Sequence, residues 1–305
     1  MNTITPRKVV WIVHPRDFHD IEEKIPFLKL FPHFLKYYLI LCIPPYKVSE
    51  FKKNGQGEGY IVGVMLLPIH FQRNKFVMTL RVKQAFKLAK KLGADKISIG
   101  GILSGVVEKN KMSKLFGVEV FDGTNLLAHT LAEKVQRVLL MQDSAKSSIG
   151  IIGATTKSGS ILSKLLAPLN IKELHIFAKT EKNVLALAEE CRKVGTINVI
   201  THTDFSSIGK CDISILTAYI RHEDGVSLVD DIKKNSLFIS GIEPVSPFVF
   251  ELEKSRPDIQ LIKDIKLETP GLTYDNMSSV ISDGSAFACL TEALVAEDYA
   301  NYKIL

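Results

Sequence analysis

The segment Ser148-Ile-Gly-Ile-Ile-Gly-Ala-Thr-Thr-Lys-Ser-Gly-Ser160, followed by Ile161-Leu-Ser-Lys-Leu-Leu166, decides the fold predicted for this chain. Its isoleucines before Gly153 predict a buried strand, and the apolar spacing after Ser160 predicts a helix. Gly153 and Gly159 predict a tight turn between the two elements. This order of strand, glycine turn and helix is typical of a Rossmann-type domain, in which the helix N-terminus binds a pyrophosphate.

The glycine turn has the spacing G-x-x-x-x-x-G, with Thr156 at the place where a third glycine usually stands. The motif on its own is weak, and an ordinary strand-to-helix turn with two glycines is the alternative. As a phosphate-binding turn it would use the following candidate cofactor-binding residues: Gly153, Ala154, Thr155, Thr156, Ser158 and Gly159.

The second strand of the predicted unit, residues 174–178, indicates which dinucleotide would bind. Enzymes that use NAD place Asp or Glu at the end of this strand to bind the ribose 2′-hydroxyl. This chain has Lys179 and Thr180 there, with Lys182 nearby, which favours NADPH. Further parallel strands are predicted at 197–200, 213–216, 237–240 and 260–262. The two residues after the strand at 213–216 complete the cofactor-binding set: Thr217 and Ala218.

The length of 305 residues suits two α/β domains. We expect a substrate domain at 1–145, then a Rossmann-type NADP-binding domain at 146–305 whose C-terminal helix returns to the cleft. A helix at 126–141 would carry the chain across the boundary. No run of eighteen apolar residues occurs, and we expect a cytoplasmic protein.

The net charge of +6 is unevenly distributed. Residues 1–145 carry 22 Lys and Arg against 12 Asp and Glu, whereas residues 146–305 carry 17 against 21. The basic half could face nucleic acid, an anionic membrane or an acidic protein, or could be only a solvated surface. We expect an acidic protein partner and no nucleic acid, and a peripheral membrane contact stays open.

Three predicted strands of the first domain end in polar or glycine-bearing segments, where open α/β sheets place their sites. The strand at 9–13 ends at His14, a catalytic candidate whose alternative is a structural role. The strand at 96–99 leads to Gly100, Gly101 and Ser104, and the strand at 119–121 leads to Thr124 and Asn125. We expect Ser104 to act in catalysis and the other four residues to bind substrate: Gly100, Gly101, Thr124 and Asn125.

Other patterns predict structure without a site. Residues 38–43 and 60–67 are predicted strands, with Cys42 buried and a turn at 57–59, and residues 73–92 are a predicted helix with Phe76 on its apolar side. The cysteines lack metal-ligand spacing, so no metal site is expected. Cys191 and Cys211 are interpreted as structural.

The last predicted element is a helix at 285–298 with Ser285 as its N-cap. Cys289 would then lie at or just past the first turn, where the helix dipole favours a thiolate. A buried core cysteine is the alternative.

Several stretches together resemble the cyanobacterial long-chain acyl-[acyl-carrier-protein] reductases and the related predicted amino acid dehydrogenases. They are the helix at 76–94 with Ile99-Gly-Gly-Ile-Leu-Ser-Gly105, the Gly123-Thr-Asn125 and Gly153-Ala-Thr155 turns, and Ala286-Phe-Ala-Cys-Leu-Thr-Glu-Ala293. The resemblance covers most of residues 60–305, and the cysteine helix is its most specific part. Thr156 departs from the glycine of this family's turn, and the first sixty residues match weakly.

This resemblance implies NADPH-dependent reduction of a fatty acyl thioester, carried by an acyl-carrier protein or coenzyme A, to an aldehyde. It also implies that the acyl group passes through a cysteine that matches Cys289. Two alternatives remain: an NADP-dependent dehydrogenase of a small polar substrate, similar to shikimate dehydrogenases, and a non-catalytic dinucleotide sensor, suggested by Thr156.

Overall fold

The computed structural model describes residues 8–141, 144–220, 222–242, 245–263, 265–275 and 281–295. It divides the chain into two compact α/β units. Unit 1 comprises residues 1–123 and 266–305, and unit 2 comprises residues 124–265. Each unit is built on its own six-stranded sheet.

The sheet of unit 2 is parallel throughout, in the order β11-β10-β9-β6-β7-β8. With β6 counted as the first strand, this is the order 6-5-4-1-2-3 that defines a Rossmann-type dinucleotide-binding sheet. The strands are β6 (Ser148–Ile152), β7 (Glu173–Phe177), β8 (Asn198–His202), β9 (Ile213–Leu216), β10 (Leu237–Ser240) and β11 (Gln260–Ile262).

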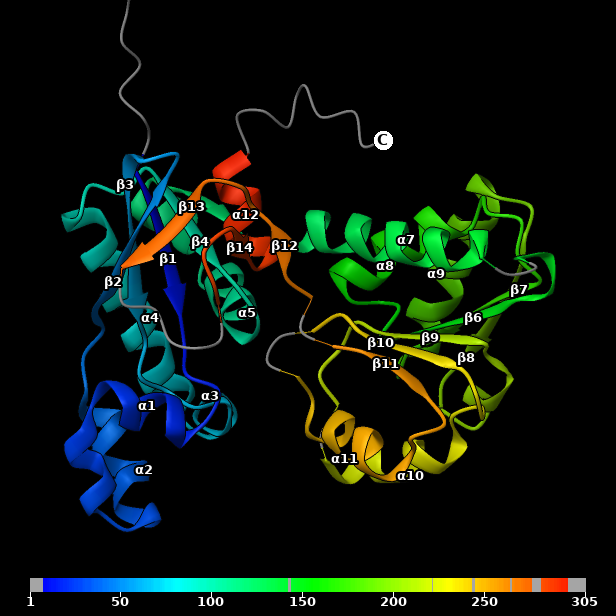
Figure 1. Cartoon of the computed structure of the whole chain (residues 1–305), viewed down its shortest axis with the longest axis horizontal. Helices are drawn as coiled ribbons and strands as arrows, with labels where there is room; N and C mark the ends of the chain where they lie inside the picture. Colours follow the sequence, from blue (N-terminus) through cyan, green and yellow to red (C-terminus); the bar gives the residue numbers. More distant parts are fainter. Residues whose placement is uncertain are drawn as a thin grey trace, which may run out of the picture. The chain divides into compact units, whose positions relative to one another are not determined.

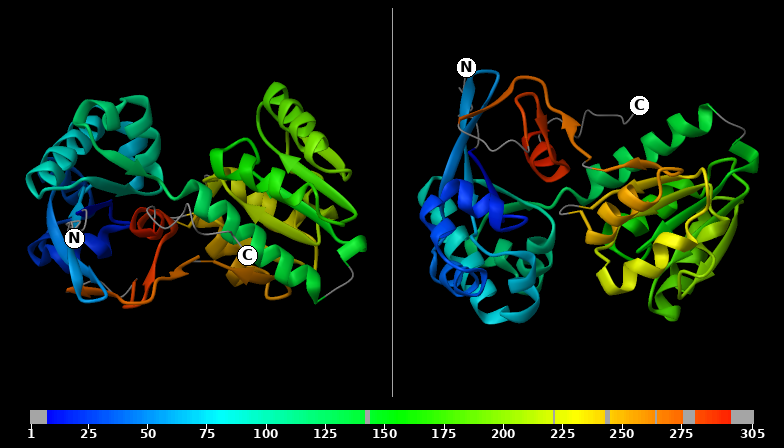
Figure 2. Two further views of the ribbon diagram at one scale, coloured as in Figure 1. Left: turned by 90° about the horizontal axis from the view of Figure 1, so that it is seen from above. Right: turned by 60° about the horizontal axis from the view of Figure 1, so that its bottom comes forward.

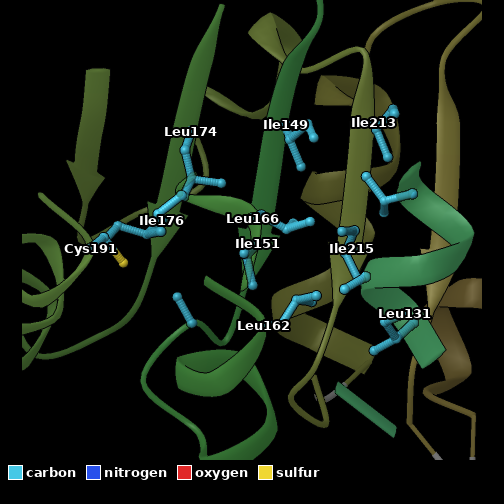
Figure 3. Close-up of a cluster of buried hydrophobic side chains, with 14 of the residues drawn as sticks. Leu131, Ile149, Ile151, Leu162, Leu166, Leu174, Ile176, Cys191, Ile213 and Ile215 are labelled. Carbon is cyan, nitrogen blue, oxygen red and sulfur yellow. The ribbon is translucent and has the colours of Figure 1, made fainter. Parts of the chain in front are cut away.

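Helices cover both faces of this sheet (Figure 1). One face carries α7 (Thr124–Leu140), α8 (Lys157–Leu166) and α9 (Glu181–Val194), and the other carries α10 (His222–Asp231) and α11 (Pro247–Ser255). Figure 3 shows the core under the first face, where Leu131 of α7 and Leu162 of α8 pack against strand isoleucines such as Ile151. Because α7 contributes to this core, it belongs to unit 2 although the predicted second domain begins only at 146.

The sheet of unit 1 has the order β13-β2-β3-β1-β4-β5. Its β3, β1, β4 and β5 are parallel, and β2 and β13 add an antiparallel edge. The strands are β1 (Val9–Val13), β2 (Tyr46–Lys53), β3 (Gln56–Gly63), β4 (Lys96–Ile99), β5 (Glu119–Phe121) and β13 (Leu272–Asp275).

Most helices of unit 1 come from the first half of the chain, and a small helical lobe lies beyond one end of the sheet (Figure 1). The lobe contains α1 (Phe18–Lys24), the 3₁₀ helix η1 (Pro26–Leu30) and α2 (His33–Cys42). The remaining early helices are α3 (Pro68–Arg73), α4 (Lys75–Lys91), α5 (Ile102–Lys109) and α6 (Met112–Phe116).

The C-terminal segment returns to unit 1, which corrects the predicted division of the chain at 145/146. β13 pairs with β2, visible as the orange arrow across the blue strands in Figure 1. α12 (Ala288–Val295), red in both views of Figure 2, packs on β1, β4 and β5. Residues 266–295 therefore complete the first sheet, and the final helix is part of the predicted substrate domain.

Four further predictions about local structure are wrong. Residues 38–42 belong to α2, in which Cys42 is exposed, and only Ile43 is extended. The turn before β3 lies at Asn54 and Gly55, not at 57–59. Phe76 is exposed on α4. Ser285 lies in the short strand β14 (Ser285–Ala286), which pairs with β12 (Leu267–Glu268), so α12 begins three residues later than predicted.

No helix in the described residues is long and apolar enough to span a membrane. Within the same residues, no group of three or more His, Cys, Asp or Glu side chains is arranged to hold a metal ion.

Candidate functional site

The glycine turn of unit 2 joins β6 to α8 in the predicted way. Gly153 has a φ of +81°, which an L-residue adopts only with strain. A Cβ atom at Gly153 would lie 2.3 Å from the Cβ of Ala218, and one at Gly159 would lie 2.4 Å from the Gly153 carbonyl oxygen. Both glycines are therefore required by close packing.

The end of β9 closes against this turn. Thr217 Oγ1 donates to the carbonyl oxygens of Ile152 and Gly153, each at 3.0 Å. Ala218 follows it and touches Gly153, as the Cβ position above shows. The structure thus brings Thr217 and Ala218 together with the glycine turn, as predicted.

Thr156 is the N-cap of α8. Its Oγ1 accepts a hydrogen bond from the Gly159 amide at 3.1 Å and lies 3.3 Å from the Thr217 carbonyl oxygen. An N-cap side chain satisfies one of the free amides at a helix start. Thr156 therefore holds the turn in place, while Thr155 is exposed and Ser158 is half-buried in the first turn of α8.

Lys179 and Thr180 follow β7 at the same carboxyl edge of the sheet. Lys179 has a side chain that is 78% exposed, and its Nζ lies 3.4 Å from Asp224 Oδ2 of α10. Thr180 is the N-cap of α9, without a side-chain hydrogen bond to the helix. The cation predicted to select NADPH is present, and a carboxylate faces it.

Cys289 lies in the first turn of α12, at the carboxyl ends of β4 and β5. A Cβ atom at Gly100, directly after β4, would lie 3.0 Å from Cys289 Sγ. Gly123, just after β5, has a φ of +74°, and its Cβ would lie 2.4 Å from the Cys289 backbone nitrogen. The Gly123 amide also donates to Glu292 Oε2 at 2.8 Å. Segments from three distant parts of the chain thus meet at Cys289.

The Cys289 thiol is 6% exposed and lies among the apolar side chains of Trp11, Phe51 and Leu290. Burial raises the pKa of Cys289 to about 11. The nearby Ser98 and Trp11 side chains and the backbone amides of Cys289 and Leu290 act in the opposite direction and lower this pKa. The predicted effect of the helix N-terminus is present, but desolvation outweighs it, and the resting group at neutral pH is the thiol.

The other buried cysteines also have raised pKa values, about 11 for Cys191 and about 12 for Cys211, both mainly because of burial. A raised pKa therefore does not distinguish Cys289. Its distinction is the set of donors that surround its sulfur.

His14 follows β1 at the same carboxyl edge. Ile12 of β1 pairs with Ile99 of β4, which places His14 and Gly101 at corresponding positions two residues beyond this pair. Nδ1 of His14 lies 3.0 Å from the Pro15 carbonyl oxygen. Since a carbonyl only accepts, Nδ1 carries the proton of the neutral ring and Nε2 keeps a lone pair. Burial lowers the pKa of His14, partly offset by the Pro15 carbonyl and the Asp20 carboxylate.

The remaining predicted site residues are not all brought together in one place. Ser104 is in the first turn of α5, and its Oγ donates to the Gly101 carbonyl oxygen at 2.9 Å. Thr124 and Asn125 are the first residues of α7 and belong to unit 2, whereas Gly100 and Gly101 belong to unit 1. The proposed substrate-binding set is therefore divided between the two units.

Sequence reasoning did not identify Ser98 or Trp11 beside Cys289. Ser98 is completely buried, and its Oγ makes no hydrogen bond of ordinary length in the part of the chain that the structure describes. Two signals were available in the sequence: Ser98 is a polar residue between isoleucines in a short strand, and Trp11 is the single tryptophan.

No protein-family model matches the sequence, and no curated protein matches it. Three solved structures with partial likeness are lactate dehydrogenase from Eimeria maxima, malate dehydrogenase from Plasmodium falciparum and a putative NADPH:quinone reductase from Bacillus thuringiensis. Their sequence identities are 15%, 16% and 15%, and each has a TM-score of 0.31. The matches cover 39%, 39% and 43% of this chain and 44%, 45% and 41% of those chains, respectively. The chain thus spans less than half the length of each, and the Rossmann-type fold of unit 2 is identified by its own strand order.

Proposed function

We propose that the protein is an NADPH-dependent acyl-thioester reductase that forms an aldehyde through an acyl group held on Cys289. The observation that carries this proposal is the meeting of Gly100, Gly123 and the α12 N-terminus around one thiol. The segments 99–105, 123–125 and 286–293 carry the resemblance to acyl-carrier-protein reductases, and they are far apart in sequence. Their assembly around a cysteine at a strand-end site supports a shared chemical role.

In the first step, Cys289 Sγ attacks the thioester carbonyl and its proton moves to a base. We assign His14 Nε2 as this base, because His14 lies at the same sheet edge and its imidazole is neutral at pH 7. The carbon–sulfur bond to the carrier breaks, the carrier thiol takes the proton, and the acyl group stays on Cys289. In this proposal, the two amides at the start of α12 and the nearby Ser98 and Trp11 side chains would favour negative charge on the sulfur before attack.

The residues of unit 2 fit a dinucleotide. The Gly153 turn, the start of α8 and Ser158 would hold the pyrophosphate, and Lys179 would contact the 2′-phosphate. When bound, NADPH would supply the hydride that reduces the acyl thioester to the aldehyde; Cys289 would leave as a thiolate and regain its proton from water. The proposed reaction therefore needs both units.

The acyl donor in this proposal is an acyl-carrier protein or an acyl-CoA. The excess of ten positive charges in residues 1–145 supports an acidic carrier protein, because such charge accelerates encounter with an oppositely charged partner. We also propose that the protein acts in the cytoplasm.

A dehydrogenase of a small polar substrate is the second candidate. The low exposure of Cys289 and its raised pKa favour this alternative, because a buried thiol can be a core residue only. A dinucleotide sensor without catalysis is the third, and Thr156 as an N-cap in place of glycine is the feature that suggests it.

The test is the rate of aldehyde formation from acyl-CoA and NADPH by Cys289→Ser. We expect a loss of about a thousandfold or more with NADPH binding unchanged, because serine keeps the shape but is a far weaker nucleophile. Cys191→Ser, a buried cysteine of unit 2, is the matched control and should keep its rate. Aldehyde formation by Cys289→Ser near the wild-type rate would exclude the covalent route.

A further inference from the structure

The exposed apolar side chains of this protein are concentrated in the helical lobe and the adjoining helices of unit 1. Of fourteen large apolar residues that are exposed in the described part of the chain, seven lie between residues 27 and 80. They are Phe27, Leu30, Phe34, Tyr38, Ile69, Phe76 and Leu80. Single exposed apolar residues are normal on a soluble surface, but a concentration of this kind indicates an interaction site.

Helix α2 is apolar on more sides than its packing needs. Its inner side contributes Ile40 to a small core with Ile21, Leu28 and Leu67. Its outer side carries Phe34 and Tyr38, four residues apart on one helix face, with 69% and 62% of their surface exposed. Neither ring belongs to this small core, so both are available for a partner.

Helix α4 continues this surface. Phe76, which is 81% exposed, and Leu80 lie on one face of this helix, and the same face continues with the half-buried Lys83 and the exposed Lys87 and Lys90. Arg81 Nη2 donates to the Leu41 carbonyl oxygen at 2.7 Å, and Asn74 Nδ2 donates to Tyr37 Oη at 3.2 Å. These bonds fasten the C-terminal half of α2 to the first two turns of α4, so the two exposed stripes are on neighbouring helices.

The charge of α3 and α4 has one sign. Residues 68–94 contain seven Lys and Arg and no Asp or Glu. None of these seven forms an ion pair with a carboxylate among the described residues. An anionic partner would meet no repelling charge along α3 and α4.

We propose that this surface, formed by the seven apolar residues above with Arg73, Lys75, Lys83 and Lys87, docks onto an anionic membrane. Aromatic rings and leucines would enter the headgroup region, and the lysines would face the lipid phosphates. Phe76 and Leu80, with Lys83 and Lys87 further along α4, combine the two features that hold a surface at an anionic bilayer: exposed apolar side chains and basic ones.

The position of the lobe in unit 1 is consistent with the proposed reductase activity. The proposal of a membrane-docking surface rests on that proposed function at this point only. The chain enters α1 directly after His14, so the lobe begins at the carboxyl edge where Cys289 lies. A fatty aldehyde released at this edge would partition into an adjacent bilayer.

The test is flotation of the full-length protein with vesicles of phosphatidylcholine alone or mixed with phosphatidylglycerol. We expect binding to the anionic vesicles, weaker binding to neutral ones, and a decrease as salt is added. No binding to anionic vesicles at low salt would overturn the proposal.

Two double variants separate the contributions. Phe34→Ser with Phe76→Ser should lower the vesicle partition coefficient roughly tenfold or more at every salt concentration. Lys83→Gln with Lys87→Gln should lower it by a similar factor and flatten its salt dependence. Phe34, Phe76 and Lys87 are exposed and Lys83 is half-buried, so the thermal unfolding transition should move little.

The matched controls are exposed residues of unit 2: Leu185→Ser with Phe250→Ser, and Lys193→Gln with Lys234→Gln. A loss in the controls equal to that in the lobe variants would contradict the proposed surface. If vesicles do not bind but the lysine pair is needed for activity with an acyl-carrier protein, the surface serves an acidic protein instead. Vesicle binding does not depend on turnover, so a failure of the covalent mechanism leaves this result intact.

Discussion

The glycine turn of unit 2 and the cysteine junction of unit 1 both place a helix N-terminus at the carboxyl ends of parallel strands. The turn is made mainly of one contiguous segment, residues 148–160, and only Thr217 and Ala218 come from elsewhere. The cysteine junction combines β1, β4, the end of β5 and α12, which are separated by up to about 280 residues. A contiguous motif can be identified from sequence, whereas the partners of Cys289 require the fold.

The two helix starts also use their amides differently. At α8, the Gly159 amide is bonded to Thr156, and the surrounding turn has exposed positions such as Thr155. At α12, the amides of Cys289 and Leu290 act on a sulfur that is almost completely buried. The first arrangement suits a ligand that arrives from solvent, and the second suits a charge formed inside the protein for one step of a reaction.

Of the variants that test this comparison, Gly123→Ala at the cysteine junction should have the largest effect on stability. The new Cβ would meet backbone atoms of Cys289 and Ala288 at 2.4–2.8 Å, and the φ of +74° adds strain. We expect unit 1 to lose roughly 2–5 kcal/mol of unfolding free energy. Urea unfolding followed by circular dichroism measures this loss.

The control for this variant is Gly105→Ala in α5, where an added Cβ meets nothing within 4 Å. It should be neutral or stabilise the helix by up to about 1 kcal/mol. Equal stability of Gly123→Ala and wild type would mean that the close packing of Gly123 against α12 is not maintained in solution.

A smaller effect, on the KM for NADPH, is expected from variants of the proposed cofactor site in unit 2. Lys179→Ala should raise the KM for NADPH about tenfold to a hundredfold and leave the KM for NADH unchanged, because a charge-assisted contact to the 2′-phosphate is lost. Asp224→Asn should act in the opposite direction, since Asp224 faces the Lys179 ammonium. Steady-state kinetics with both nucleotides checks this, with Lys182→Ala as the control. A Lys182 variant that changes the preference more than the Lys179 variant would transfer the phosphate contact to Lys182.

The smallest effect should come from Thr156. Thr156→Ala removes the N-cap bond to the Gly159 amide and should cost about 1 kcal/mol of stability. Thr156→Gly should cost only a few tenths of this and should bind NADPH at least as tightly as wild type, because the turn then gains a third glycine. Calorimetric melting and NADPH titration of both variants test this pair. Weaker NADPH binding by Thr156→Gly would show that the threonine itself contacts the cofactor.

The sequence predicts unit 2 well because its strands are short apolar runs between clear turn signals. β9, β10 and β11 have the predicted bounds, and β6 begins and ends around the predicted isoleucines. In unit 1, β4 and β5 are also confirmed. Each of these strands is a short apolar run in its own sequence, so the hydrophobic pattern alone is sufficient to predict it.

The errors occur where distant contacts decide the structure. Residues 38–43 are an apolar run that suits either a strand or a helix, and packing of α2 on α3 and α4 selects the helix. β2 is not predicted because its sequence, Tyr46-Lys-Val-Ser-Glu-Phe-Lys-Lys53, has no apolar run; it pairs with β3 beside it in the chain and with β13 more than 200 residues away. Pairing of β14 with β12 likewise moves the start of α12 past Ser285.

The central claim is that Cys289 carries the acyl group. It is tested most directly by the intact mass of the protein after incubation with an acyl-CoA and no NADPH. We predict a mass increase of one acyl group, placed on Cys289 by peptide mapping, absent in Cys289→Ser and retained in Cys191→Ser. NADPH added afterwards should remove the adduct and release aldehyde. An unmodified wild-type protein that nevertheless produces aldehyde, or an adduct that persists in Cys289→Ser, would contradict the claim.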